Sequence, residues 1–205
     1  MKHKLKNIVK TYPIFPTLVS RFGLGGPRFK ALGDLPKNAI GAEIGVHLGD
    51  FSHYMLDIAK PKRLYLIDPW KVFDSDDYSD SWYGNKVTQE IMDERYQHVC
   101  NRFRNKIKRG QVQVIREESV KGLGGLTDES LDFVYIDGDH SYEGVAKDLE
   151  LSLQKIKSGG LITGDDYGPG NWWEGGIKRA VDEFGWHDSV KLLWIEGTQF
   201  VLQKR

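Results

Sequence analysis

The amino-acid sequence predicts an α/β fold in which a mostly parallel sheet is covered by helices on both faces. Two observations carry this prediction. From about residue 39 onward, short apolar segments alternate with amphipathic helical segments, and such alternation is typical of parallel sheets. Near the end of the chain, two further apolar segments flank the pair Glu196-Gly197, which predicts an antiparallel hairpin.

The apolar segments have the length and composition of buried strands. Continuous apolar runs of this kind indicate strands that are covered on both sides. The parallel strands are expected at Ala39–Ile44, Arg63–Ile67, Val112–Ile115, Leu131–Ile136 and Leu161–Thr163, and the hairpin strands at Val190–Ile195 and Thr198–Leu202.

Apolar residues at helical spacing predict the helices between these strands. The four stripes are Phe51, Met55 and Ile58; Met92, Tyr96, Val99, Phe103 and Ile107; Val145, Leu149, Leu153 and Ile156; and Ile177, Ala180, Val181 and Phe184. Ser158-Gly159-Gly160 follows the third stripe and predicts the end of that helix. Residues 72–85 are polar and lack periodicity, which predicts a loop or lid.

Length, composition and charge exclude several classes of protein. With 205 residues and 40% hydrophobic residues, the chain can bury a core, which argues against wholesale disorder. The 29 basic and 29 acidic residues cancel, which argues against general nucleic-acid binding. Cys100 is the only cysteine, so an internal disulfide is excluded and a cytoplasmic location is expected. No apolar stretch approaches the roughly 20 residues of a membrane span.

The first part of the chain is strongly basic. Residues 1–40 contain eight Lys or Arg residues and one Asp, which gives a net charge of 8 − 1 = +7. We expect residues 1–38 to form a basic, partly helical N-terminal arm ahead of the folded domain. A solvated arm explains this composition most simply. Weak contact with an anionic membrane surface is the alternative.

The first strand ends in a glycine turn. Right-handed crossovers place the carboxyl ends of parallel strands along one sheet edge, where ligands bind. Glu43, Gly45 and Gly49 lie in this turn, and glycine permits close approach of a ligand to the backbone. The next helix offers free N–H groups to an anion. The spacing differs from the G-x-G-x-x-G of dinucleotide binders, and an ordinary glycine turn explains it equally well.

The second and third strands also end in polar residues. Asp68 follows the second strand, and an acid there can accept hydrogen bonds from both hydroxyls of a ribose. Trp70 either stacks on a base or belongs to the core. Glu118 and Ser119 follow the third strand, at a place where a purine edge can be recognised.

Three carboxylates follow the fourth and fifth strands. Asp137, Asp165 and Asp166 are expected at neighbouring strand ends, where they would repel one another unless a cation joins them. Their oxygen atoms suit Mg²⁺, Mn²⁺ or Ca²⁺. The alternative is that these acids cap helices and turns, as Asp139 or Ser141 would. His140 lies beside this group, where it can act as a general base near neutral pH.

Together, these motifs resemble a known enzyme family. AEIGVHLGDFS, LYLIDPW, DFVYIDGDHSYEGVAKDLE and GGLITGDDY, with the terminal hairpin, resemble class I S-adenosylmethionine-dependent methyltransferases over about residues 39–203. The resemblance is closest to the metal-dependent macrocin and mycinamicin sugar O-methyltransferases. It implies a Rossmann-like, seven-stranded, mostly parallel sheet with an antiparallel C-terminal hairpin, and a methyltransferase domain over residues 39–205.

The resemblance also implies roles for individual residues. Glu43, Gly45 and Gly49 would line the methionine end of S-adenosylmethionine, with His47 and Ser52 as further contacts, and Asp68 would hold the ribose. Trp70, Glu118 and Ser119 would surround the adenine. Asp137, Asp165 and Asp166 would hold Mg²⁺ or another divalent cation, and His140 would be the catalytic base beside Asp137. The N-terminal oligomerisation elements of the macrolide enzymes are missing, so the acceptor is expected to differ, and a homo-oligomer remains possible.

The expected reaction is methyl transfer to a hydroxyl of a small molecule, sugar or other glycan. Residues 72–85 and Trp172-Trp173 are expected to close over this acceptor. A nicotinamide-dependent oxidoreductase is the nearest alternative, but Tyr142 is followed by Ala146 where a Tyr-x-x-x-Lys pair needs lysine. A metal-dependent hydrolase would use the aspartates but leaves Asp68 unexplained. A non-catalytic binding module is the third alternative.

Overall fold

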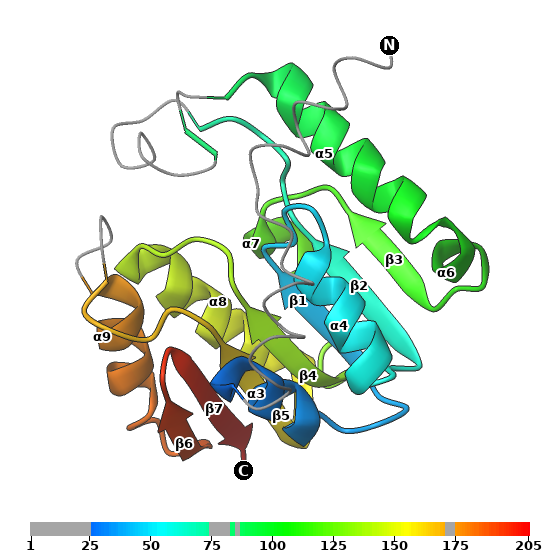
Figure 1. Cartoon of the computed structure of the whole chain (residues 1–205). Coiled ribbons are helices and arrows are strands. Elements are labelled where there is room, and N and C mark those ends of the chain that lie inside the picture. Colours follow the sequence, from blue (N-terminus) through cyan, green and yellow to red (C-terminus); the bar gives the residue numbers. More distant parts are fainter. Residues whose placement is uncertain (1–25, 74–82, 85–86, 171–174) are drawn as a thin grey trace.

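A seven-stranded sheet forms the centre of the molecule (Figure 1). The computed structural model describes residues 26–73, 83–84, 87–170 and 175–205. The strand order is β3-β2-β1-β4-β5-β7-β6. The strands are β1 (Ile40–Ile44), β2 (Arg63–Ile67), β3 (Val112–Ile115), β4 (Leu131–Ile136), β5 (Ile156–Gly164), β6 (Val190–Glu196) and β7 (Gln199–Lys204).

Strands β1 to β5 pair in parallel with their neighbours, whereas β7 is antiparallel to both β5 and β6. This confirms the predicted mostly parallel sheet with a C-terminal hairpin. The described helices are α3 (Pro27–Asp34), α4 (Asp50–Ile58), α5 (Gln89–Arg102), α6 (Arg104–Lys108), α7 (Ser119–Gly122), α8 (Tyr142–Lys155) and α9 (Gly176–Phe184). None of them is long and apolar enough to cross a membrane.

Alternate residues of β4 show how the two faces of the sheet are covered. Phe133 and Tyr135 belong to a core cluster shared with apolar residues of α3, α4 and α5. Val134 and Ile136 belong to a second cluster, shared with α8 and α9. Successive side chains of a strand point to opposite faces, so one helical layer lies on each side. The predicted helices on both faces are confirmed.

The prediction for the end of the third helical stripe was wrong. Helix α8 ends at Lys155, and β5 begins at Ile156. Ser158-Gly159-Gly160 therefore lies inside β5, where Gly159 has φ +80° and the pairing with β4 shifts register between Leu131 and Phe133. The glycines accommodate an irregular strand pairing instead of ending a helix. In the hairpin, β6 extends one residue further than predicted, to Glu196. Strand β7 begins at Gln199 instead of Thr198 and ends at Lys204 instead of Leu202.

Helix α3 comes from the segment predicted to be a basic arm, of which residues 26–38 are described. Its Leu32 is fully buried. Its Lys30 forms an ion pair with Glu196, and Asp34 accepts a 2.9 Å hydrogen bond from Trp194 Nε1. This part of the arm is therefore docked on the C-terminal hairpin. Most of the predicted loop at 72–85, and the pair Trp172-Trp173, lie outside the described residues.

Candidate functional site

The turn after β1 brings three strand ends into backbone contact. Gly45 has φ +83°, and a Cβ placed on it would lie 1.8 Å from the carbonyl oxygen of Asp137. Its N–H donates to the Ile67 carbonyl over 3.0 Å. Gly49, with φ +74°, precedes helix α4, which has no side-chain cap at its N-terminus. Both glycines are required by local geometry, and the first N–H groups of α4 lack a capping side chain.

Asp68 lies at the carboxyl end of β2 and binds the turn after β1. Its carboxylate accepts hydrogen bonds from the backbone N–H groups of Val46, His47 and Trp70 over 2.9, 2.9 and 2.8 Å. The Tyr83 hydroxyl donates to it over 2.6 Å. Burial raises the pKa of Asp68, and these donors oppose the rise. Asp68 therefore fixes the relative positions of the ends of β1 and β2.

The residues predicted to surround an adenine follow β2 and β3, and the Lys71–Glu118 ion pair joins their segments. Trp70 is fully buried, and its indole N–H donates to the His47 carbonyl over 2.9 Å. The structure thus gives this ring the core position that the sequence left open. Glu118 is exposed and pairs with Lys71 over 3.1 Å. Ser119 begins the short helix α7.

Glu43 is the buried acid of β1. Its side chain is 1% exposed, and its Oε2 has no hydrogen-bond partner among the described residues. Burial raises the pKa of Glu43 to about 8. The neighbouring Ser52 is also fully buried. Burial lowers the pKa of His47 to about 3, with the charge of Arg95 acting in the same direction. Ser52 opposes the rise in the pKa of Glu43, but a buried carboxylate oxygen without a donor is costly, which makes Glu43 a candidate ligand-binding residue.

Asp137 and Asp165 do share a cation, and it is Arg28 of α3. Arg28 Nη2 lies 2.5 Å from Asp137 Oδ2, and Arg28 Nη1 lies 2.8 Å from Asp165 Oδ2. Asp165 Oδ1 also accepts hydrogen bonds from Thr198 Oγ1, over 2.5 Å, and from Gln199 Nε2. Both carboxylate oxygens of Asp165 therefore bind side chains of this protein, Oδ2 through an ion pair and Oδ1 through hydrogen bonds.

Asp166 pairs with His140 instead of joining the other two aspartates. Asp166 Oδ2 lies 2.7 Å from His140 Nε2. One ligand atom each of Asp137, His140 and Asp166 lies within 4.8 Å of the others. Burial acts to lower the pKa of His140, but Asp166 and Asp137 outweigh it and the pKa is raised. Burial raises the pKa of Asp137 to about 7, although Arg28 opposes the rise.

The alternative capping role is confirmed for two other residues of this loop. Ser141 Oγ accepts a hydrogen bond from Gly144 N over 3.1 Å, and Asp139 Oδ1 accepts one from Ser141 N over 2.9 Å. Ser141 is therefore the N-cap of helix α8, and Asp139 holds the backbone of that cap in place. Asp137 and His140 do not cap this helix. Each contributes a ligand atom to the cluster with Asp166.

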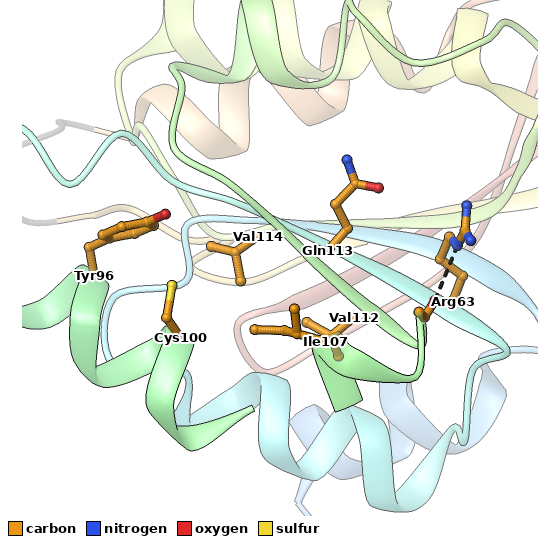
Figure 2. A pocket seen from close by; sticks show the side chains of 8 residues that line it. Arg63, Tyr96, Cys100, Ile107, Val112, Gln113 and Val114 are labelled. Atoms are coloured by element: carbon orange, nitrogen blue, oxygen red, sulfur yellow. Dashed lines mark hydrogen bonds between the residues drawn. The ribbon is translucent and has the colours of Figure 1, made fainter. Parts of the chain in front are cut away.

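The structure has a small cavity beside the carboxylates and a larger groove away from them. The cavity, of about 10 Å³, lies at the carboxyl ends of β4 and β5, with Asp137, His140 and Asp165 among its lining residues. That is the space of about one water molecule. The groove, of about 340 Å³, is lined by residues including Arg63, Cys100 and Val112 (Figure 2). Arg63 and Val112 begin β2 and β3, so the groove lies away from the strand ends that carry the carboxylates.

A family comparison decides the class of this protein. Residues 42–167 match the model of a methyltransferase domain family. The chain belongs to this family. It is a class I S-adenosylmethionine-dependent methyltransferase, which sets aside the oxidoreductase and hydrolase alternatives. The matched residues include the ends of β1 to β5, whereas helix α3 lies outside them.

Solved structures share the fold of this methyltransferase. Cofactor-bound Rv0187 from MTB aligns with a TM-score of 0.63 at 14% identity, covering 94% of this chain and 96% of that one. The O-methyltransferase TomG from Streptomyces achromogenes, solved with SAM, aligns with a TM-score of 0.57 at 15% identity, covering 82% and 73%.

A curated relative matches this methyltransferase over part of its length. It is the uncharacterized protein R132 of Acanthamoeba polyphaga mimivirus, which is 28% identical over 130 residues. The match covers 63% of this chain and 52% of that protein, so the chain spans about half the length of that relative.

Sequence reasoning missed Arg28, Tyr83, Thr198 and Gln199 as members of this methyltransferase's site. Thr198 and Gln199 had a signal, because an antiparallel last strand beside β5 must bring the hairpin turn to Asp165. The sequence carries a weaker signal for Arg28, because Gly26-Pro27 is a typical helix start and so predicts a helix that contains this arginine. Nothing in the local pattern indicates that this helix delivers its arginine to strand ends more than 100 residues away.

Proposed function

We propose that this methyltransferase transfers a methyl group to a hydroxyl oxygen of a small molecule or sugar, assisted by a divalent cation such as Mg²⁺. The observation that supports this most directly is the cluster of Asp137, His140 and Asp166, which lies beside the turn of β1 through the Gly45–Asp137 contact. The fold shared with the O-methyltransferase TomG and the resemblance to macrocin- and mycinamicin-type enzymes support the same proposal.

The residues around β1 fit S-adenosylmethionine. Glu43 has a buried oxygen without a donor, and the ammonium group of the methionine part would supply one. The uncapped start of α4 suits its carboxylate. Asp68 would hold the ribose, with hydroxyls of the sugar taking the place of the Tyr83 hydroxyl. Further proposed contacts are Gly45, His47, Gly49 and Ser52 near the methionine part and Trp70, Glu118 and Ser119 near the adenine.

The carboxylate cluster fits a divalent cation only in part. Asp137, His140 and Asp166 offer two oxygen atoms and one nitrogen atom within a short distance. Asp165 was expected to be a third carboxylate ligand, but its oxygens already bind Arg28, Thr198 and Gln199. We therefore propose Asp137 and Asp166 as the carboxylate ligands of the cation, with Asp165 outside the set and with His140 kept as the base. A bound cation lowers the pKa of a coordinated hydroxyl and orients it.

His140 is the proposed base. Its Nε2 faces Asp166, and the Gly138 carbonyl holds the ring on its other side. On accepting the hydroxyl proton, the imidazolium is stabilised by Asp166. The new bond forms between the acceptor oxygen and the methyl carbon, the bond between that carbon and sulfur breaks, and S-adenosylhomocysteine leaves. The rigid turn at Gly45 contributes by aligning the reactants.

We propose residues 39–205 as the catalytic domain and residues 1–38 as a preceding arm whose α3 docks onto it. The acceptor is a hydroxyl of a small molecule or glycan. We also propose weak contact of the basic N-terminus with a membrane surface, and self-association of the chain.

Calorimetry with S-adenosylhomocysteine tests the cofactor part of this proposal. We expect the wild-type chain to bind it and Glu43→Gln to bind it at least tenfold more weakly. Asp57→Asn, on the exposed side of α4 near its C-terminal end, is the matched control and should bind normally. Absence of binding by the wild-type chain would overturn the proposal. Release of S-adenosylhomocysteine with a panel of sugar and catechol acceptors, with and without a chelator, then tests the metal. Unchanged turnover under chelation contradicts its role.

A further inference from the structure

Helix α3 delivers a cation to the centre of the carboxylate cluster. Arg28 lies in the first turn of α3, and its two terminal nitrogens contact different aspartates, Asp137 over 2.5 Å and Asp165 over 2.8 Å. Two neighbouring carboxylates repel one another until a positive charge lies between them. The structure shows that this charge comes from the chain itself, from a helix outside the family-matched residues 42–167.

The arginine is a permanent cation in a partly open position. A guanidinium stays protonated at any working pH, and its planar fork suits two carboxylates at once. Its carbon atom Cζ lies 4.2 Å from the centre of the Phe51 ring, a contact that stabilises the cation. The Arg28 side chain is nevertheless 36% exposed. Its Nε is buried without a hydrogen-bond partner among the described residues, so the guanidinium is held by its two terminal nitrogens and by Phe51, and a release from Asp137 requires a rotation of the side chain.

The backbone that carries Arg28 is firmly docked. Lys30 Nζ lies 4.4 Å from the centre of the Trp194 ring and forms an ion pair with Glu196. Asp34 binds the indole N–H of Trp194 over 2.9 Å, and Leu32 is fully buried. These contacts hold the backbone of α3 beside the cluster, so the position of Arg28 is a built feature of the fold.

Asp137 is shared between two possible partners. Its Oδ2 binds Arg28, and the same side chain contributes a ligand atom to the group with His140 and Asp166. A divalent cation in that group would bring two further positive charges against a carboxylate that already holds a guanidinium. Like charges at such distances repel strongly in a partly buried site. The two cations therefore cannot bind Asp137 independently.

We propose that Arg28 competes with the divalent cation for Asp137, so that the metal binds only when the guanidinium leaves this carboxylate. This deepens the metal-assisted reaction proposed above and rests on it. Asp165 retains Thr198 and Gln199 as partners during the exchange, so it does not lose all its donors when Arg28 moves. The arginine then sets the metal concentration at which the site loads.

Titration of the full chain with Mn²⁺, followed by the electron paramagnetic resonance signal of free Mn²⁺, tests this proposal. We expect Arg28→Gln to bind Mn²⁺ at least tenfold more tightly than the wild-type chain. Arg28→Lys should fall between them, because lysine keeps the charge but cannot bridge two carboxylates. Asp137→Asn should weaken binding in both the wild-type and the Arg28→Gln background. Equal or weaker binding by Arg28→Gln, or no binding by either chain, overturns the proposal.

Arg179→Gln is the matched control. It removes one positive charge from an exposed pair with Glu183 on α9, and its Mn²⁺ affinity should stay within twofold of the wild type. The guanidinium N–H signal of Arg28 in a ¹H–¹⁵N spectrum of the wild-type chain is a second measurement that does not depend on a variant folding. Saturating Mg²⁺ should shift this signal, and an unchanged signal contradicts the proposal. Failure of S-adenosylhomocysteine binding would overturn the proposed methyl transfer. The difference in Mn²⁺ affinity between the wild-type and Arg28→Gln chains would still test the competition.

Discussion

The ends of β1 and β2 and the ends of β4 and β5 lie along one sheet edge, but the carboxylates in the two regions bind different kinds of hydrogen-bond donor. Asp68 binds donors that are 22 or fewer residues away, and three of these four donors are backbone N–H groups. Asp137 binds Arg28, which is 109 residues away and donates from its side chain. Asp165 likewise binds side chains of the hairpin.

This difference separates a fixed part of the site from an exchangeable one. A backbone donor moves only when the chain moves, whereas a side chain can rotate and release its partner. The ends of β1 and β2 are therefore a rigid platform, which suits the binding of a cofactor with a constant shape. The ends of β4 and β5 can change partners, which suits a metal and a varied acceptor. The predictions below test this comparison, beginning with the largest expected effect.

Replacing Gly45 with alanine should break the platform. The added Cβ would lie 1.8 Å from the Asp137 carbonyl oxygen, in a backbone with φ +83°. We expect the free energy of unfolding to fall by about 4 kcal/mol, measured by urea denaturation. Gly159→Ala is the control, because Gly159 has φ +80° with open space around its Cα. It should cost only about 1 kcal/mol. Similar losses in the two variants would show that the close contact is unimportant.

Asp68→Asn should weaken the platform without adding bulk. The amide would turn an N–H₂ group toward donors that now bind a carboxylate oxygen, so at least one buried N–H would lose its acceptor. We expect a loss of about 2 to 3 kcal/mol in the free energy of unfolding. Asp50→Asn, which removes an exposed partner of Arg102, should cost about 0.5 kcal/mol. A change of the same size in both variants would contradict the fixed role of Asp68.

Asp148 is a buried acid outside both regions. Among the described residues, it has neither backbone donors like those of Asp68 nor an arginine partner like that of Asp137. Asp148 of α8 is 1% exposed, and its polar neighbour is the Ser119 side chain. Burial raises the pKa of Asp148 to about 7, well above the ordinary range of an aspartate, because the hydrogen bond with Ser119 only partly opposes it. A folded-state pKa above the unfolded one means that ionisation favours the unfolded chain. The stability contributed by protonated Asp148 is therefore lost as the pH rises from about 4 to about 7.

Asp148→Asn should remove this loss. We expect its free energy of unfolding to exceed that of the wild type by about 4 kcal/mol at pH 8, and to match it below pH 4. Thermal and urea unfolding between pH 4 and pH 8 would measure both values. The variant keeps the remaining pH dependence of Glu43 and Asp137. Equal stability of the two chains at pH 8 would show that Asp148 has a partner in solution.

The fold was more predictable than the contacts of the site. Apolar runs such as Arg63–Ile67 and Leu131–Ile136 have the predicted bounds, because burial between two helical layers requires uninterrupted apolar residues. The parallel topology then brought the acids to one edge, as expected. The hairpin and the capping residues of α8 were also predictable, because their signals are local. The strand over Ser158-Gly159-Gly160 was not, because pairing with β4 overrides the tendency of glycine to end helices.

The partners of the acids could not be predicted, because side-chain pairing depends on packing between distant segments. The clustering of Asp137, Asp165 and Asp166 predicted that a cation is required, but it did not identify that cation. Arg28 was counted with a basic arm because its charge looks like those of Lys2 or Lys4 in sequence. Only the docking of α3 on the hairpin distinguishes it. Whether residues such as Trp70 and Ser119 contact a cofactor stays a prediction.

The docking of α3 also determines the order in which the molecule assembles. The helix precedes every strand of the sheet in the chain, yet it binds Asp137, Asp165 and the hairpin residues Trp194 and Glu196, which are made after it. Chains fold from the N-terminus as they emerge from the ribosome, but α3 must wait for the hairpin. The acidic edge therefore stays without its arginine until β6 and β7 have been made, and α3 docks after the strands that follow it in the chain.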